Sequence, residues 1–254
     1  MLYVATRLAN LQAIRQFSTK LSLANLQMAR VKLLFCHGLG ASPKNSVSLK
    51  IHQWADQHDV PAYGLSYRDY GNEDVIWNVN DWRRDIVNVL SQDDNTKTVI
   101  VGSSAGCQAV LRAAVDMPEA IAGLLLFSPG VGVGLDYMDR VLPGSVEKLQ
   151  AGKILNHPCV DPSLKIKVDM ENLLEFVDNC VTKTQRRIRL NCPVRIVHGM
   201  KDKLVPFKNS LKLLSQIDSP NKALYLVNDG HFITDRTTIE QALDSLWDAI
   251  EGDL

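Results

Sequence analysis

A serine-containing turn directly after a buried strand is the feature that most constrains the fold of this chain. Residues 97–101 form an apolar run typical of a buried strand, and the sequence Gly-Ser-Ser-Ala-Gly follows at residues 102–106. Residues 107–115 contain no proline or glycine and are compatible with a helix. A Gly-x-Ser-x-Gly segment between strand and helix makes a strained turn that lifts the central hydroxyl above the sheet. Ser104, and not Ser103, is therefore the candidate nucleophile.

A serine nucleophile needs a histidine base and a carboxylate that orients the histidine, and both follow further along the chain. Residues 193–199 read as a strand that leads into a loop containing Asp202. Residues 223–227 read as the next strand, and His231 lies on the loop after it. Asp229 is a weaker candidate for the acid, because it is only two residues from His231 and cannot easily turn its carboxylate onto the imidazole. His37 and His198 are expected to support backbone turns.

The chain order Ser, Asp, His, with each residue just after a strand, resembles that of the α/β hydrolase superfamily. Residues 31–36 form another strand-like run, which ends in a His-Gly-Leu-Gly segment at residues 37–40 similar to the His-Gly loop of that superfamily. The resemblance implies an oxyanion hole made of two backbone amides. By position these are the N–H groups of Leu39 and Ala105.

Strand-like and helix-like segments alternate along the chain, which predicts an α/β fold with a mostly parallel sheet covered by helices on both faces. Two further strands are expected at residues 61–66 and 123–127, which gives six strand candidates in all. Helices are expected at residues 45–58 and 73–90. We expect the front of the chain to be too short to supply the clear antiparallel pair that the superfamily often has there.

Residues 130–192 separate two predicted strands by far more chain than a simple crossover needs. We expect this segment to form a cap over the nucleophile, with helices around residues 136–150 and 170–187. The resemblance implies that such an insertion shapes the substrate pocket. Apolar side chains near its start are the predicted substrate contacts, although they can equally pack the cap itself; they are Val131, Leu135, Met138 and Leu142.

Composition limits the classes of function. Lys plus Arg and Asp plus Glu each number 28, so the formal net charge is zero and nothing indicates a nucleic-acid surface. No apolar run approaches the length of a membrane span. The five cysteines are scattered without a Cys-x-x-Cys pair and are expected to be reduced thiols. The sequence lacks the clustered ligands of a metal site, and we expect no metal and no cofactor.

The N-terminal segment is basic and free of acidic residues, as no Asp or Glu precedes Asp56. Arginine and lysine occur there among leucine, alanine, serine and glutamine, a composition that matches a mitochondrial presequence. Residues 15–18 resemble a site where such presequences are cut. We therefore expect a presequence at residues 1–17, a hydrolase domain at residues 18–254 and a location in the mitochondrial matrix. The alternative is an N-terminal amphipathic helix packed on the domain of a cytoplasmic protein.

Three further stretches, at residues 82–86, 102–104 and 193–206, resemble the mitochondrial palmitoyl-protein thioesterase branch of the abhydrolase-domain proteins. That resemblance implies a serine hydrolase that removes acyl groups from protein cysteines and hydrolyses some acyl glucuronides, so the expected substrate is an acylated protein or a small-molecule ester. The chain departs from the branch at Ala105, Gly106 and Cys107, where a larger residue and two glycines are usual. The alternatives are a small-ester carboxylesterase, a C–C-bond hydrolase, or a catalytically silent binding protein.

Overall fold

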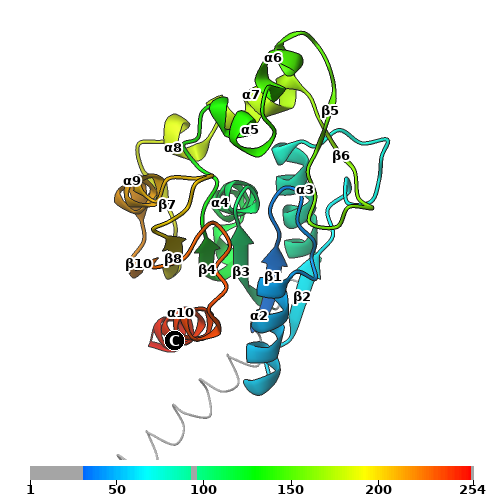
Figure 1. The fold of residues 1–254 in the computed structure, drawn as a ribbon. Coiled ribbons are helices and arrows are strands. Elements are labelled where there is room, and N and C mark those ends of the chain that lie inside the picture. Colours follow the sequence, from blue (N-terminus) through cyan, green and yellow to red (C-terminus); the bar gives the residue numbers. More distant parts are fainter. Residues whose placement is uncertain (1–30, 93–95, 253–254) are drawn as a thin grey trace, which may run out of the picture.

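The computed structural model describes residues 31–92 and 96–252 and is built on one six-stranded sheet (Figure 1). All neighbouring strands are parallel, in the order β10-β8-β4-β3-β1-β2. The sheet confirms the predicted α/β class, and each of its strands falls on a predicted strand. The strands are β1 (Val31–Cys36), β2 (Ala62–Leu65), β3 (Lys97–Ser103), β4 (Ile121–Phe127), β8 (Val194–Gly199) and β10 (Lys222–Val227).

Helices cover both faces of the sheet, as the alternating pattern predicts (Figure 1). Side chains of β1 alternate between the two cores: Leu34 packs with helices α3 and α4, whereas Leu33 and Phe35 pack with α2 and α10. Burial on both faces explains why the central strands read as continuous apolar runs. The helices are α2 (Ser46–Gln57), α3 (Val79–Leu90), α4 (Gly106–Asp116), the short 3₁₀ turn η1 (Pro118–Ala120), α9 (Lys208–Gln216) and α10 (Arg236–Gly252).

The strand order places the candidate site. The chain runs from β1 outward to β2 and returns to β3 on the other side of β1, so the direction of winding reverses between β1 and β3. Loops that follow the carboxyl ends of strands diverge at such a point and leave a crevice where ligands bind in open α/β sheets. The segments that leave β1 and β3 are the His-Gly loop and the serine turn.

One predicted helix begins later than the sequence indicated. We expected a helix over residues 73–90, but α3 begins at Val79. Asn78 caps α3 by accepting a hydrogen bond from the Asn80 amide, and Trp77 is fully buried with its own amide donating to the Lys167 carbonyl. The chain directly before Asn78 is therefore held by contacts with Lys167 of the cap segment rather than by helical hydrogen bonds.

The segment between β4 and β8 lies at the carboxyl ends of the strands, where the upper part of Figure 1 shows it. The helix expected at residues 136–150 is interrupted, because Pro143 and Gly144 separate two short helices and Gly144 adopts a left-handed φ of 72°. The helix expected at residues 170–187 ends early, and a hairpin precedes it that the sequence did not predict. These elements are α5 (Asp136–Val141), α6 (Ser145–Gln150), β5 (Leu155–His157), β6 (Ile166–Val168), α7 (Met170–Asp178), α8 (Val181–Thr184) and β7 (Ile188–Arg189), which pairs with β9 (Ile217–Asp218).

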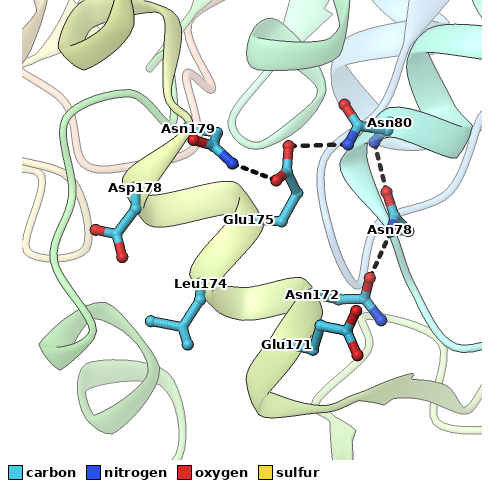
Figure 2. Close-up of a pocket in the computed structure, with 8 residues that line it drawn as sticks. All are labelled: Asn78, Asn80, Glu171, Asn172, Leu174, Glu175, Asp178 and Asn179. Carbon is cyan, nitrogen blue, oxygen red and sulfur yellow. Dashed lines mark hydrogen bonds between the residues drawn. The ribbon is translucent and has the colours of Figure 1, made fainter.

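Polar side chains tie α7 to the helix layer below it (Figure 2). Glu175 accepts a hydrogen bond from the side-chain NH₂ group of Asn80 at 2.8 Å and pairs with Arg112 of α4 at 3.1 Å. Asn78 donates to Asn172 at the start of α7. Glu175 also accepts from the side-chain NH₂ group of Asn179. Because its oxygen atoms already have these three partners, the polar hollow is an attachment point for the cap segment.

Candidate active site

Ser104 stands on a strained turn between β3 and α4. Its φ of 50° lies in the left-handed region, which a residue with a side chain seldom adopts without compensating contacts. The Ser104 amide donates to the Phe127 carbonyl at 2.9 Å. A Cβ atom at Gly106 would lie 2.3 Å from the His37 carbonyl oxygen, so only glycine permits this approach of α4 to the loop after β1. The local sequence therefore dictates the strained turn.

His231 and Asp202 complete a chain of hydrogen bonds from Ser104. His231 lies on the loop after β10, with Nε2 2.9 Å from the Ser104 Oγ and Nδ1 2.7 Å from the Asp202 Oδ2. A carboxylate only accepts, so Nδ1 carries the proton and donates to Asp202, and Nε2 is left to accept from the Ser104 hydroxyl. The structure thus brings together the three side chains that the sequence selected.

Asp202 is held as a buried carboxylate. Its side chain is fully buried, and Oδ1 accepts hydrogen bonds from the Leu204 and Val205 amides at 2.8 and 2.9 Å. Burial alone raises the pKa of the Asp202 carboxyl, but hydrogen bonds from His198, His231 and the Val205 amide outweigh it and hold this pKa well below its usual range. The group is therefore ionised throughout the neutral range.

His198 contacts the same carboxylate, a role that the sequence did not reveal. Its Nε2 lies 3.1 Å from the Asp202 Oδ2 and 3.0 Å from the Val205 carbonyl, so Nε2 faces two acceptors and must carry the proton. Its Nδ1 lies 2.6 Å from the Ser210 hydroxyl of α9. The expected turn contact is present, and His198 also supplies a second donor to Asp202. Its position four residues before Asp202, at the end of a strand, was the available signal.

Asp229, the alternative acid, serves its own loop. Its carboxylate accepts from the Gly230 amide at 2.8 Å and from the amide and hydroxyl of Thr234 at 2.7 and 3.0 Å. These bonds shape the loop that carries His231. No hydrogen bond between Asp229 and His231 occurs in the described part of the chain.

The His-Gly loop lies against the serine turn. A Cβ atom at Gly38 would lie 2.8 Å from the Ser104 Cβ, so this glycine allows direct contact between loop and turn. Within residues 31–92 and 96–252, neither the Leu39 amide nor the Ala105 amide donates to another group of the protein. His37 donates from Nδ1 to the Gly38 carbonyl, as expected for a turn, and burial lowers the pKa of His37 to about 4.

A cavity of about 690 Å³ opens over Ser104 and His231. It lies between the His-Gly loop, the start of α2, helix α5 and the segment after β5. Its wall is largely apolar, and two of its hydrophobic side chains are exposed at the surface, with Val160 at 69% and Phe232 at 55% exposure. The volume falls within the range of small-molecule sites.

The predicted substrate contacts do not line this cavity. Val131 and Met138 are fully buried in the hydrophobic core, and Leu135 packs against that core. Leu142 is half-buried outside the cavity. The side chains of α5 that face the cavity are instead Tyr137 and Val141.

The described residues form neither a metal site nor a membrane-spanning helix. Among residues 31–92 and 96–252, no group of three His, Cys, Asp or Glu side chains is arranged to hold a metal ion. In the same part of the chain, no helix is long and apolar enough to cross a bilayer.

No family model matches the sequence, so the comparisons rest on individual relatives and structures. A mouse protein described as alpha/beta hydrolase domain-containing protein 10 superposes with a TM-score of 0.71 at 22% identity, covering 88% of this chain and 90% of that one. A putative hydrolase from Agrobacterium vitis S4 also gives 0.71, at 20% identity, covering 88% and 89%.

The sheet order, the strained turn and these neighbours together show that the chain has the α/β hydrolase fold. In sequence it is similar to palmitoyl-protein thioesterase ABHD10, mitochondrial. The Mus musculus protein is 24% identical over 251 residues, which cover 94% of this chain and 84% of the relative. The Homo sapiens protein is 22% identical over 249 residues, covering 92% and 79%.

Proposed function

We propose that this protein is a serine hydrolase that cleaves acyl thioesters or esters through an acyl-enzyme on Ser104. One observation carries the proposal: the hydrogen-bonded chain from the Ser104 hydroxyl through His231 to the buried Asp202 carboxylate. Each link has the polarity that proton transfer from the serine requires. The thioesterase names of the relatives support the same class of reaction.

The first half of the reaction forms the acyl-enzyme. The Ser104 oxygen attacks the acyl carbonyl carbon while His231 Nε2 takes the hydroxyl proton, and the carbonyl electron pair moves onto oxygen. The amides of Leu39 and Ala105 donate to that oxyanion. Collapse of the tetrahedral intermediate breaks the bond to the leaving thiol or alcohol, which receives the proton from His231.

The second half returns the enzyme to its starting state. Water attacks the acyl carbonyl and gives a proton to His231, and collapse releases the carboxylic acid and restores the Ser104 hydroxyl with that proton. Asp202 keeps its charge throughout, because it accepts from His231 Nδ1 in both halves and stabilises the imidazolium between them. No metal or cofactor enters either half.

A medium or long acyl chain is the substrate that fits the cavity best. Val47, Tyr137, Val141 and Leu204 give it apolar walls. Each methylene buried from water contributes about 0.8 kcal/mol, so a long chain gains binding energy that an acetyl group lacks. In this proposal the cap segment, about residues 130–192, forms one side of the acyl site through α5, and the acylated substrate is a protein or a small-molecule ester.

A mitochondrial matrix location is the second part of the proposal. The relatives carry mitochondrial names, and residues 1–30 are basic and free of acidic residues. The proposed presequence, residues 1–17, lies outside the described residues. A fusion of residues 1–30 to a reporter is expected to enter mitochondria and be cut near Phe17, whereas retention in the cytoplasm would refute this part.

A substrate panel tests the chemistry. We expect kcat/KM for acyl thioesters to rise from C2 toward longer chains, and Tyr137→Ala to reduce this chain-length preference. A monotonic fall with chain length would favour a small-ester carboxylesterase. Absence of hydrolysis of all thioesters, oxygen esters and C–C substrates, together with no labelling by a fluorophosphonate, would indicate a silent binding protein.

A further inference from the structure

His157 carries an unpaired acceptor at the wall of the catalytic cavity. This residue ends strand β5 in the cap segment, is only 6% exposed and lines the cavity together with Ser104 and His231. Its Nε2 atom is buried and has no hydrogen-bond partner in the described part of the chain. Buried polar atoms in folded proteins nearly always have a partner, so an unpaired one on a side chain of the cavity wall points to a ligand.

The protonation state of this ring follows from its neighbour. His157 Nδ1 lies 2.7 Å from the Pro158 carbonyl oxygen, which can only accept, so Nδ1 carries a proton. Burial lowers the pKa of His157 to about 4, although the hydrogen bond to Pro158 acts in the opposite direction. The ring is therefore neutral at neutral pH, and Nε2 presents a lone pair without a hydrogen.

The ring is fixed beside the loop proposed to stabilise the oxyanion. A Cβ atom at Gly40 would lie 2.9 Å from the His157 Nδ1 and 2.4 Å from the Pro158 carbonyl oxygen. The Val160 amide donates to the Gly40 carbonyl at 2.8 Å. Gly38, two residues before Gly40, contacts Ser104. His157 thus joins the cap segment to the loop that touches the candidate nucleophile.

We propose that His157 Nε2 accepts a hydrogen bond from the substrate, so that the site prefers acyl substrates with a hydroxyl or amide N–H near the scissile bond. The inference rests on the proposed function, because it assigns the substrate of the same site. A lone pair accepts only from a donor, and the remaining cavity wall is largely apolar. A cysteinyl peptide supplies an amide N–H, and a glyceryl or sugar ester supplies a hydroxyl.

Two matched substrate pairs separate these sources. The first pair is S-decanoyl-N-acetylcysteine methyl ester and its N-methylated amide; the second is monodecanoylglycerol and its di-O-methyl ether. We expect the wild-type protein to prefer the donor-bearing member of at least one pair by about tenfold, the effect of one hydrogen bond. A preference in the first pair assigns a peptide amide, and a preference in the second pair assigns a hydroxyl.

Substitution of His157 distinguishes a substrate contact from a structural one. His157→Asn retains an amide that can donate to Pro158 but has no atom at the Nε2 position, so the preference ratio should fall to near one. His157→Gln places an amide oxygen within reach of that position and should restore most of the ratio. His58→Asn is the matched control, because His58 Nδ1 also pairs with a backbone carbonyl, that of Trp54 at 2.8 Å, at the far end of α2.

The preference within each substrate pair should also appear as a ratio of dissociation constants, measured by calorimetry with the Ser104→Ala variant. A wild-type ratio near one in both pairs, or an unchanged ratio in His157→Asn, overturns the proposal. Failure of the proposed function gives a different result, because Ser104 would then resist fluorophosphonate while the binding ratios still report on His157.

Discussion

Replacement of Asp202 by asparagine isolates the electrostatic role of the candidate acid. The two oxygen atoms of this carboxylate have different donors: Oδ1 accepts from the Leu204 and Val205 amides, and Oδ2 accepts from His231 and His198. In Asp202→Asn the amide oxygen must occupy the Oδ1 position, because two N–H groups point at it. The NH₂ group is then directed at the two imidazoles.

This arrangement reverses the hydrogen bond to His231. An NH₂ group donates, so the neutral His231 ring must present a bare Nδ1 to it and carry its proton on Nε2. Nε2 then cannot accept from the Ser104 hydroxyl, 2.9 Å away. We expect kcat/KM to fall by about 10³- to 10⁴-fold, or roughly 4–5.5 kcal/mol in transition-state stabilisation; the upper value is the effect of the equivalent Asp-to-Asn change in a serine protease.

The same substitution also affects stability. His198 Nε2–H would face an N–H donor in place of Oδ2, although it keeps the Val205 carbonyl as an acceptor. We expect the free energy of unfolding to fall by about 1–3 kcal/mol, because two buried N–H donors would then face each other. Circular dichroism should show a folded protein with a lowered Tm, which separates lost chemistry from lost structure.

Asp229→Asn provides the matched control, because Asp229 lies on the same loop as His231 and makes its hydrogen bonds to Gly230 and Thr234 instead. Steady-state kinetics measured from pH 6 to 9 should give this variant a kcat/KM within about threefold of the wild-type value. This account of the acid would be refuted if Asp202→Asn kept more than a tenth of the wild-type kcat/KM, or if both variants lost kcat/KM equally.

Two further predictions concern the serine turn and a buried carboxyl. Gly106→Ala should reduce kcat/KM at least about 100-fold and lower Tm, because its Cβ would lie 2.3 Å from the His37 carbonyl; activity near that of the wild type would contradict the close packing. Asp69 accepts from Trp82 through Oδ1, and burial raises the pKa of its carboxyl to about 6. The protonated Asp69 carboxyl therefore contributes its full stability below about pH 4, which is the pKa of this group in the unfolded chain. The contribution is lost as the pH rises through about 6, the pKa in the folded protein. In urea unfolding, the free energy of unfolding of Asp69→Asn should rise by about 2 kcal/mol relative to that of the wild type between pH 4 and pH 8. A difference between the two proteins that stays constant with pH would be inconsistent with a raised pKa.

Much of the sheet and the serine turn could be predicted because their sequence signals are local. Burial on both faces makes β3 and β4 nearly uninterrupted apolar runs, and Gly102 and Gly106 mark the turn between β3 and α4. Ser104, Asp202 and His231 were found because each follows a strand end, and the ends of parallel strands meet at one edge of a sheet.

The cap segment was less predictable because its contacts are not local. Periodicity identifies an apolar side of α5 but not which side faces a cavity, and Met138 enters the core whereas Tyr137 and Val141 line the cavity. The interruption of the predicted helix at Pro143 and Gly144 was visible in the sequence. The unpaired Nε2 of His157 was not, since hydrogen-bond partners are a property of the folded chain.

The covalent acyl-enzyme is the most direct test of the central claim. Wild-type protein mixed rapidly with a decanoyl thioester and quenched in acid should show, by intact-protein mass spectrometry, an adduct of one decanoyl group. Peptide mapping should place that group on Ser104; Ser103→Ala should retain the adduct and Ser104→Ala should lose it. A decanoyl group on any other residue, or turnover by Ser104→Ala at the wild-type rate, would contradict the claim that Ser104 is the nucleophile.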